Sequence, residues 1–309
     1  MRITNNMIFG ATTRHANAHL DKLFGLQNQL ATGKKITRPS DDPTGTDRAM
    51  LLRGTLKQQE QYQENIRDAG TWLKITDGAL DEAYSVMDRA RELAVSGAND
   101  PNKADERNAM AEEIKQLRSQ LQVIANSEIN GRFIFGGTKT IVQPTAAPPF
   151  SMPYPDPVPP ATEITYTGNN VLMDVEVVPG VTLPFNTPGA SAFGDPADAD
   201  RAFKVLEDLE NALRAGDADV ISAQIGRLDV AMGRVTTERA VVGSRINRLD
   251  LLENRYADAA VSYKERLSET EEPEFADVVA QLMQSESVYQ ASLKASARIM
   301  QPSLMDYLR

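Results

Sequence analysis

The sequence contains no cysteine, and this absence removes several kinds of chemistry at once. Disulfide bonds, thiolate metal sites and cysteine nucleophiles are all excluded. Histidine is nearly absent too, because only His15 and His19 occur among the 309 residues. These two lie four positions apart, but Ala16 stands where a zinc-protease motif needs glutamate, and no third ligand is near. We therefore expect no metal and no cofactor.

Aromatic residues, basic charge and long apolar runs are also scarce. Aromatic residues make up 6% of the chain, which suits long helices better than a β-sandwich. The 33 basic and 43 acidic side chains give a net charge of -10, which weighs against nucleic-acid binding. No apolar run approaches the ~18–20 residues of a membrane span. Residues 1–13 lack the apolar stretch of a secretory signal. We expect no membrane partner, and either a cytoplasmic protein or export with the N-terminus intact.

Motifs that resemble catalytic sites have simpler explanations here. Asp41 and Asp42 are adjacent carboxylates, but the prolines around them favour a turn in which Asp42 caps the next helix and Pro43 begins it. The glycine-bracketed segment 131–137 lacks the Gly-Lys-Ser/Thr of a phosphate loop and predicts a short strand. Trp72, the single tryptophan, is expected in a core or an interface. With no nucleophile elbow either, the sequence predicts a protein that is not an enzyme.

Helical periodicity is abundant. Apolar residues recur every seven positions through segments 43–98 and 217–268, as in helices that pack on other helices. Shorter helices are expected over 102–127 and 197–215. We interpret the stripes of the long helices as ordinary internal core.

Both ends of the chain carry weaker stripes. Helices are expected over 5–32, before Gly33, and over 274–300, after the acidic cluster 269–274. In the second of these, two rows are spaced by seven residues: Phe275, Leu282, Tyr289 and Ser296, and Val279, Glu286, Leu293 and Met300. The residues predicted to make assembly contacts are Leu20, Leu23, Leu30, Val279, Leu282, Tyr289, Leu293 and Met300. The residues predicted to form the structural turn are Arg38, Asp41, Asp42 and Pro43. Many neighbouring side chains are small, so these helices are expected to order only on assembly.

The middle of the chain differs in composition. Twelve of the 17 prolines lie between residues 144 and 196, and residues 140–200 hold seven acidic side chains and no basic one. Strands are expected over 163–167 and 171–178. The predicted fold is mainly α, a long-helix bundle or coiled coil formed by both chain ends, with a small β-rich domain inserted in the middle. Its expected parts are a terminal coiled coil (1–42 and 269–309), a long-helix bundle (43–138 and 197–268) and an acidic, proline-rich insert (139–196).

Several motifs resemble those of bacterial flagellins and flagellin-like hook-associated proteins. They are Met-Arg-Ile-Thr-Asn at 1–5, Leu-Ala-Thr-Gly-Lys-Lys-Ile at 30–36, Arg-Pro-Ser-Asp-Asp-Pro-Thr-Gly at 38–45, Gly-Arg-Phe-Ile-Phe-Gly-Gly-Thr at 131–138 and Pro-Ser-Leu-Met-Asp-Tyr-Leu at 302–308. The motif at 38–43 is more similar to the hook–filament junction members of the family than to flagellin. The resemblance covers about 1–138 and 200–309, and the segment 140–196 matches nothing.

The resemblance implies a structural part of the bacterial flagellum, exported through the flagellum's own type III channel without cleavage. The terminal helices would line the inner tube, the long helices would form the next shell and the insert would face outward. Implied partners are other copies in a ring, a hook-associated protein on the hook side, flagellin on the filament side and a cytoplasmic export chaperone. A small flagellin remains an alternative. An enzyme within the insert is a more remote one, since 140–196 holds neither histidine nor a basic residue.

One further segment resembles a known recognition element. Residues 89–95 are similar to the flagellin segment that the mammalian toll-like receptor for flagellin recognises, with Arg91, Glu92 and Leu93 at the matching positions. The preferred interpretation is a helix face that contacts a neighbouring subunit.

Overall fold

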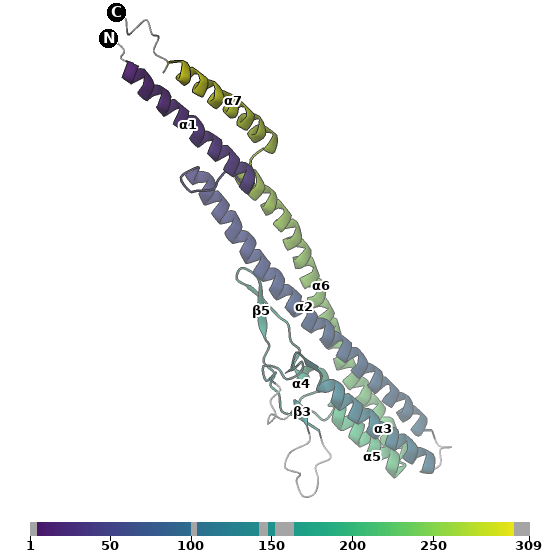
Figure 1. Ribbon diagram of the computed structural model, residues 1–309. Coiled ribbons are helices and arrows are strands. Elements are labelled where there is room, and N and C mark those ends of the chain that lie inside the picture. The colour runs from purple at the N-terminus through teal and green to yellow at the C-terminus, as the bar shows by residue number, and fades with distance from the viewer. Residues whose placement is uncertain (1–4, 100–103, 142–147, 152–163, 300–309) are drawn as a thin grey trace, which may run out of the picture. The chain divides into compact units, whose positions relative to one another are not determined.

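The computed structural model describes residues 5–99, 104–141, 148–151 and 164–299 (Figure 1). Its helices are α1 (Asn5–Thr32), α2 (Pro43–Gly97), α3 (Ala104–Ala125), α4 (Gly189–Phe193), α5 (Ala202–Ala215), α6 (Ala218–Glu271) and α7 (Phe275–Ile299). Its strands are β1 (Glu128–Ile129), β2 (Arg132–Phe133), β3 (Phe150–Ser151), β4 (Thr165–Tyr166), β5 (Asp174–Val178) and β6 (Val181–Pro184). The mainly helical fold class with strands in the middle of the chain is as predicted.

The chain forms two compact units, and the long helices α2 and α6 pass through both. Residues 60–257 make one, here called the central unit, and residues 1–59 with 258–309 make the other, here called the terminal unit. The boundaries at residues 42 and 269 that the sequence suggests therefore lie within the terminal unit. The three-part division by function stays a prediction.

The central unit is built around the seven-residue stripes of α2 and α6. Leu73, Leu80 and Met87 of α2 are fully buried, as are Leu228 and Val235 of α6. α3 and α5 pack against each other and add their apolar faces to the same core. A stripe of this kind is buried because one face of the helix is apolar along its whole length. The heptad rows of the long helices are core, as the sequence predicted.

Ion pairs on the rim of this core join α2 to α6. Arg239 donates to Asp77 at 3.2 Å and to Asp81 at 2.6 Å, and Arg91 donates to Asp229 at 2.6 Å. All are partly exposed, so each adds little stability by itself. These ion pairs instead fix which turns of the two helices face each other.

The strands form three separate two-stranded antiparallel sheets, β1-β2, β3-β4 and β5-β6. The strand predicted over 131–137 is wrong beyond Phe133. Ile134 and Phe135 are fully buried but lie in irregular backbone. A turn through Gly137, at φ 68°, then brings the chain back, so that the Phe133 amide donates to the Thr140 carbonyl at 2.8 Å. The Phe135 carbonyl instead accepts from the Gly189 amide at 2.9 Å and from the Tyr166 hydroxyl at 2.9 Å.

The remaining boundary differences are local. The strands expected over 163–167 and 171–178 shorten to β4 and β5, and the helix expected over 197–215 begins only at Ala202. Aspartate side chains explain that late start, since Asp195 and Asp198 accept from the amides two residues ahead, of Ala197 and Asp200. Such Asx turns compete with helix formation.

The described part of the acidic insert packs directly on the long helices of the central unit. Tyr256 of α6 donates its hydroxyl to the Val177 carbonyl at 2.9 Å and stacks on Tyr62 of α2, with ring centroids 6.0 Å apart. Asn65 of α2 donates to the Glu176 carbonyl at 2.9 Å. Val177 itself is fully buried. The β5-β6 hairpin is therefore held by side chains of both helices and shares their core.

Candidate functional site

The terminal unit contains the predicted assembly residues, and its two end helices lie side by side. α1 and α7 pack along each other in antiparallel orientation (Figure 1). Leu26 of α1 and Val278 and Ser285 of α7 are buried. The predicted residues that are half-buried are Leu20, Leu23, Leu30, Val279, Leu282 and Tyr289. Part of the predicted interface thus lies on or beside the contact between the two helices of one chain.

A row of small residues makes this helix contact, whereas the sequence interpretation uses the small side chains only as a reason for these helices to order on assembly. Val278, Ser285 and Ser292 lie seven apart on the buried side of α7. Small side chains let two helices approach closely. The Ser292 hydroxyl donates to the Tyr289 carbonyl at 2.7 Å and Ser296 donates to the Ser292 carbonyl at 2.7 Å. These hydroxyls are satisfied by their own helix, so they can face a partner helix at little cost.

The same unit also carries large apolar side chains that remain open to solvent. Phe275 is 60% exposed, Met283 64% and Leu293 45%, all on α7, and Phe24 on α1 is 62% exposed. Phe275 and Leu293 lie on one line of α7, about five turns apart at 3.6 residues per turn. One exposed apolar side chain is ordinary, but a row of them marks an interaction surface. We call these four residues the open apolar face. Met300, the last predicted contact, lies outside the described residues.

The link between α1 and α2 is a turn held by one carboxylate. Asp41 Oδ2 accepts from the Arg38 amide at 2.8 Å, from the Thr37 amide at 3.2 Å and from the Thr37 hydroxyl at 3.1 Å. Chiefly the Arg38 backbone bond holds the pKa of Asp41 below its ordinary value. Arg38 itself is exposed. The turn that joins the two helices is thus built on the ionised form of Asp41.

Acidification should loosen this turn, and only at low pH. A carboxylate with a lowered folded-state pKa stabilises above its unfolded pKa of about 3.9, and that contribution is lost as pH falls through the lower folded value. Amide proton shifts of Thr37 and Arg38 are therefore expected to stay constant from neutral pH to about pH 4 and to move below it. Asp41→Asn should show the loosened shifts at every pH. A midpoint above pH 4 in the unsubstituted protein would contradict this.

The start of α2 is capped by the next residue. Asp42 Oδ1 accepts from the Gly45 amide at 3.0 Å, and Pro43 occupies the first helical position. A side chain on Gly45 would meet the Asp42 carboxylate at 2.4 Å and Ile36 Cδ1 at 2.6 Å. The cap therefore favours glycine three positions on, since a larger residue would displace the capping carboxylate.

Removing this cap should destabilise the first turn of α2 locally. Asp42→Ala is expected to cost about 1 kcal/mol, the usual effect of losing a side-chain cap. Hydrogen exchange of the Gly45 and Thr46 amides should speed up roughly fivefold. Asp47→Ala, an exposed aspartate further along the same helix, is the matched control and should leave these rates unchanged. Equal acceleration in both variants would refute the capping role.

A buried carboxylate ties the end of α6 to the segment that follows α1. The Glu271 side chain is 7% exposed, and its Oε2 lies 2.6 Å from Arg53 and 3.1 Å from Lys34. The Lys35 amide also donates to the Glu271 carbonyl at 2.7 Å. A buried carboxylate is tolerated because two cations share it. Glu271 thus fixes the point at which the chain leaves α6 for α7.

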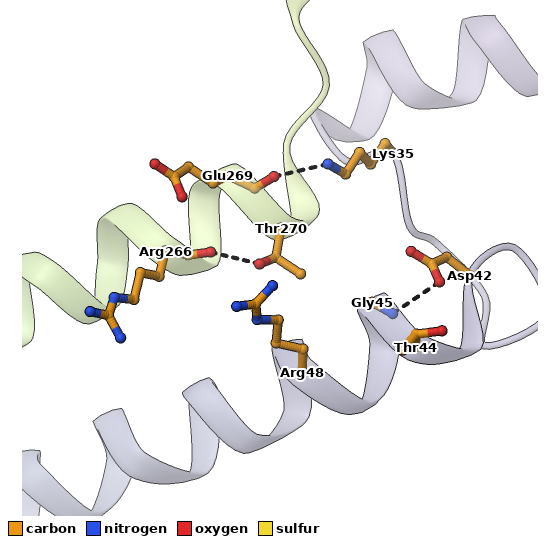
Figure 2. A pocket seen from close by; sticks show the side chains of 8 residues that line it. All are labelled: Lys35, Asp42, Thr44, Gly45, Arg48, Arg266, Glu269 and Thr270. Atoms are coloured by element: carbon orange, nitrogen blue, oxygen red, sulfur yellow. Dashed lines mark hydrogen bonds between the residues drawn. The ribbon is translucent and has the colours of Figure 1, made fainter.

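Beside this ion cluster lies a polar pocket of about 540 Å³ (Figure 2). Its cationic lining residues are Lys35 from the turn, Arg48 from α2 and Arg266 from α6. Lys35 Nζ donates to the Glu269 carbonyl at 2.9 Å. Asp42 lines the pocket too, but its carboxylate is engaged by the Gly45 amide, as the dashed line in Figure 2 shows.

The two histidines and Trp72, which the sequence raised as candidates, do not form a site among the described residues. His15 is exposed and His19 half-buried on α1, and within the described ranges no three histidine or acidic side chains gather as metal ligands would. Trp72 is buried in the central unit, edge-on to Phe185. Among the described residues, no helix combines the length and apolarity needed to cross a lipid bilayer.

The segment that resembles the receptor-recognised part of flagellin lies on α2 in the central unit. Leu93 is 7% exposed, Arg91 pairs with Asp229 of α6 and Glu92 pairs with Arg89. Two of the three side chains are thus engaged in intramolecular ion pairs and the third is buried.

Comparison with known proteins agrees with the motifs. Residues 3–140 match the family described as the bacterial flagellin N-terminal helical region. The chain is 25% identical to flagellar hook-associated protein 3 of Salmonella typhimurium over 316 residues, covering 95% of each. It is 26% identical to the flagellin of Bacillus subtilis over 261 residues, covering 81% of this chain and 80% of that one. A solved flagellar hook-associated protein from Vibrio parahaemolyticus shares the fold with a TM-score of 0.66 at 22% identity, over 75% of this chain and 100% of that one.

These likenesses point first to a class of protein. The chain resembles flagellin-like proteins, since residues 3–140 match the flagellin N-terminal helical region, and it shares its fold with a solved hook-associated protein. Within that class it is similar to hook-associated protein 3 over nearly its whole length, whereas its likeness to flagellin covers less of the chain. The sequence motifs at 30–45 and 131–138 predicted this resemblance.

Proposed function

We propose that the protein is an adaptor that joins hook and filament in the bacterial flagellum, as a ring of identical subunits. The observation that carries this proposal is the open apolar face of the terminal unit, together with the nearly full-length likeness to hook-associated protein 3. The proposed role is mechanical.

Helix packing between subunits supplies the contact energy in this proposal. Phe275, Met283 and Leu293 would be covered by helices of neighbouring copies, and burial of a large apolar side chain is worth about 1.5–3 kcal/mol. The predicted residues Leu20, Leu23, Leu30, Val279, Leu282, Tyr289 and Met300 would surround them. The turn at Arg38, Asp41, Asp42 and Pro43 would set how the terminal helices leave the long ones.

The proposal also assigns each part of the chain a place in the flagellum, together with its partners and its export route. The terminal segments 1–42 and 269–309 would line the inner tube, the helices of 43–138 and 197–268 would form the next shell, and the insert 139–196 would face outward. The partners would be a hook-associated protein on the hook side, flagellin on the filament side and a cytoplasmic chaperone before export. Export would use the flagellar type III channel, without cleavage of a signal peptide.

Seeded polymerisation followed by electron microscopy tests the adaptor against its alternative. The adaptor should remain short or monomeric alone and should cap isolated hooks only when the hook-side junction protein is present. A small flagellin, which the likeness to the Bacillus subtilis protein favours, would instead grow long filaments from filament seeds. Long filaments from this chain alone would overturn the adaptor proposal.

A further inference from the structure

We infer that the pocket lined by Lys35, Arg48 and Arg266 receives the acidic start of α7, Glu274 and Asp277, from a second copy of this chain. We call these three cations the basic pocket. The inference rests on the proposed ring and specifies one of its subunit contacts. It joins two surface patches of opposite charge on the same unit.

Two of the three cationic side chains in the basic pocket have no hydrogen-bonding or ionic partner among the described residues. No side chain in the described part of the chain makes a hydrogen bond or ion pair with the guanidinium of Arg48 or Arg266, and both arginines are exposed. Figure 2 shows Arg48 reaching from α2 toward Thr270, while the Glu269 carboxylate lies on the far side of α6. The neighbouring carboxylates therefore leave the positive charges of the two arginines without an ion pair.

This concentration of positive charge runs against the composition of the chain. Acidic side chains outnumber basic ones by 43 to 33, yet one cavity of about 540 Å³ is lined by three cations and only two acidic residues, Asp42 and Glu269. Two guanidinium groups beside one cavity repel each other unless an anion lies between them. Arginine favours carboxylates because its planar fork donates two parallel hydrogen bonds. The chemistry that fits the pocket is a pair of carboxylates.

The start of α7 presents such a pair. Glu274 and Asp277 are exposed, and neither carboxylate has a side-chain partner among the described residues. Glu274 immediately precedes the helix and its carbonyl accepts from the Val278 amide at 3.1 Å, so it lies within about one turn of Asp277 and both can enter one pocket. Glu272, by contrast, already accepts from the Ser268 hydroxyl at 2.6 Å. Phe275 lies between the two acids and is 60% exposed, so the acidic pair is continuous with the open apolar face.

Pairing of two different patches also has the right symmetry. A contact between unlike surfaces repeats head to tail, and it closes into a ring or continues as a helix. A patch that paired with itself would stop at a dimer. The basic pocket and the acidic pair therefore generate the kind of assembly that an adaptor ring requires.

Charge reversal tests this contact. The variant Arg48→Glu with Arg266→Glu should lose at least tenfold in incorporation at hook ends, measured by electron microscopy against the unsubstituted chain. Adding Glu274→Lys and Asp277→Lys to the same chain should restore most of it. The matched control, Arg67→Glu with Arg248→Glu, changes net charge equally at exposed arginines of the central unit and should incorporate normally. If the first variant melts early, Arg48→Gln with Arg266→Gln replaces it.

A cross-link gives a second readout, because the natural chain has no cysteine. Thr44→Cys, in the pocket lining, and Asp277→Cys are placed in separate chains and mixed during assembly. Oxidation should link unlike chains more than like ones.

The outcomes separate the two proposals. Normal incorporation of the arginine variants, failure of the lysine substitutions to rescue, or equal linking of like and unlike chains would overturn this contact and leave the adaptor intact. Failure of the unsubstituted chain to cap hooks would remove both.

Discussion

Leu293→Asp is expected to abolish incorporation at hook ends while leaving the helicity and melting temperature of the free chain nearly unchanged. Leu293 is 45% exposed on α7, so aspartate at this position stays in water in the monomer. In the assembly the same side chain would be covered by a neighbour, and burying an unpaired carboxylate costs several kcal/mol. A loss of that size per subunit lowers the affinity of each contact by at least a hundredfold.

Leu282→Asp is the matched comparison, because the two leucines lie on nearly the same side of one helix, about 20° apart around its axis, but differ in burial. The sequence alone predicts the same behaviour for both positions. Leu282 is half-buried beside α1, so its replacement should loosen the α1–α7 pair as well as the assembly. Hydrogen exchange along α7 should rise in the Leu282 variant and stay constant in the Leu293 variant. Early unfolding of α7 in Leu293→Asp would show that the open apolar face is core.

The long helices could be predicted from the sequence because their information is local and repeated. The apolar rows of α2 and α6 recur every seven residues over about fifty positions, so a few polar exceptions do not hide the period. Their ends carry equally local signals, such as the Asp42-Pro43 start of α2 and Gly33 after α1 with φ 66°. Helix boundaries failed only where aspartate side chains competed for the backbone, before Ala202.

The insert was predicted in kind but not in detail. Its proline content and acidity mark irregular, β-rich structure, yet its short strands pair across many residues, as Phe150 does with Tyr166. Two-residue strands carry no alternation that a sequence pattern could detect. The Phe150 ring packs on the rings of Tyr166, Phe193 and Phe203, an aromatic cluster assembled from distant segments.

The candidate site shows the same division between local and distant information. The turn residues Arg38, Asp41, Asp42 and Pro43 lie in one motif and could be found by spacing. The serine row of α7 was not predicted as a contact, because its small side chains indicate from the sequence only helices of low intrinsic stability. The basic pocket could not be found at all, since Arg48 and Arg266 come from helices at opposite ends of the sequence and are brought together only by folding.

Leu80→Ala is expected to have the largest effect on folding. Leu80 is fully buried in the core of the central unit, and Leu→Ala substitutions at such sites cost about 2–5 kcal/mol through lost burial and the cavity left behind. For a unit of this size each kcal/mol lowers the melting temperature by about 2–4 °C, so a fall of roughly 5–15 °C should appear in a calorimetric scan. Leu251→Ala, at a leucine of α6 that is 72% exposed, should shift it by less than about 2 °C.

The same pair of variants separates folding from assembly. Below its lowered melting temperature, Leu80→Ala should still cap hooks, because Leu80 has no exposed surface to offer a neighbour and the terminal unit is unchanged. Leu293→Asp should behave in the opposite way, with normal melting and no capping. The two substitutions thus dissociate stability from incorporation in both directions, as expected if subunits are joined through the terminal unit. Loss of capping by Leu80→Ala at a temperature where it is fully folded would place a subunit contact in the central unit instead.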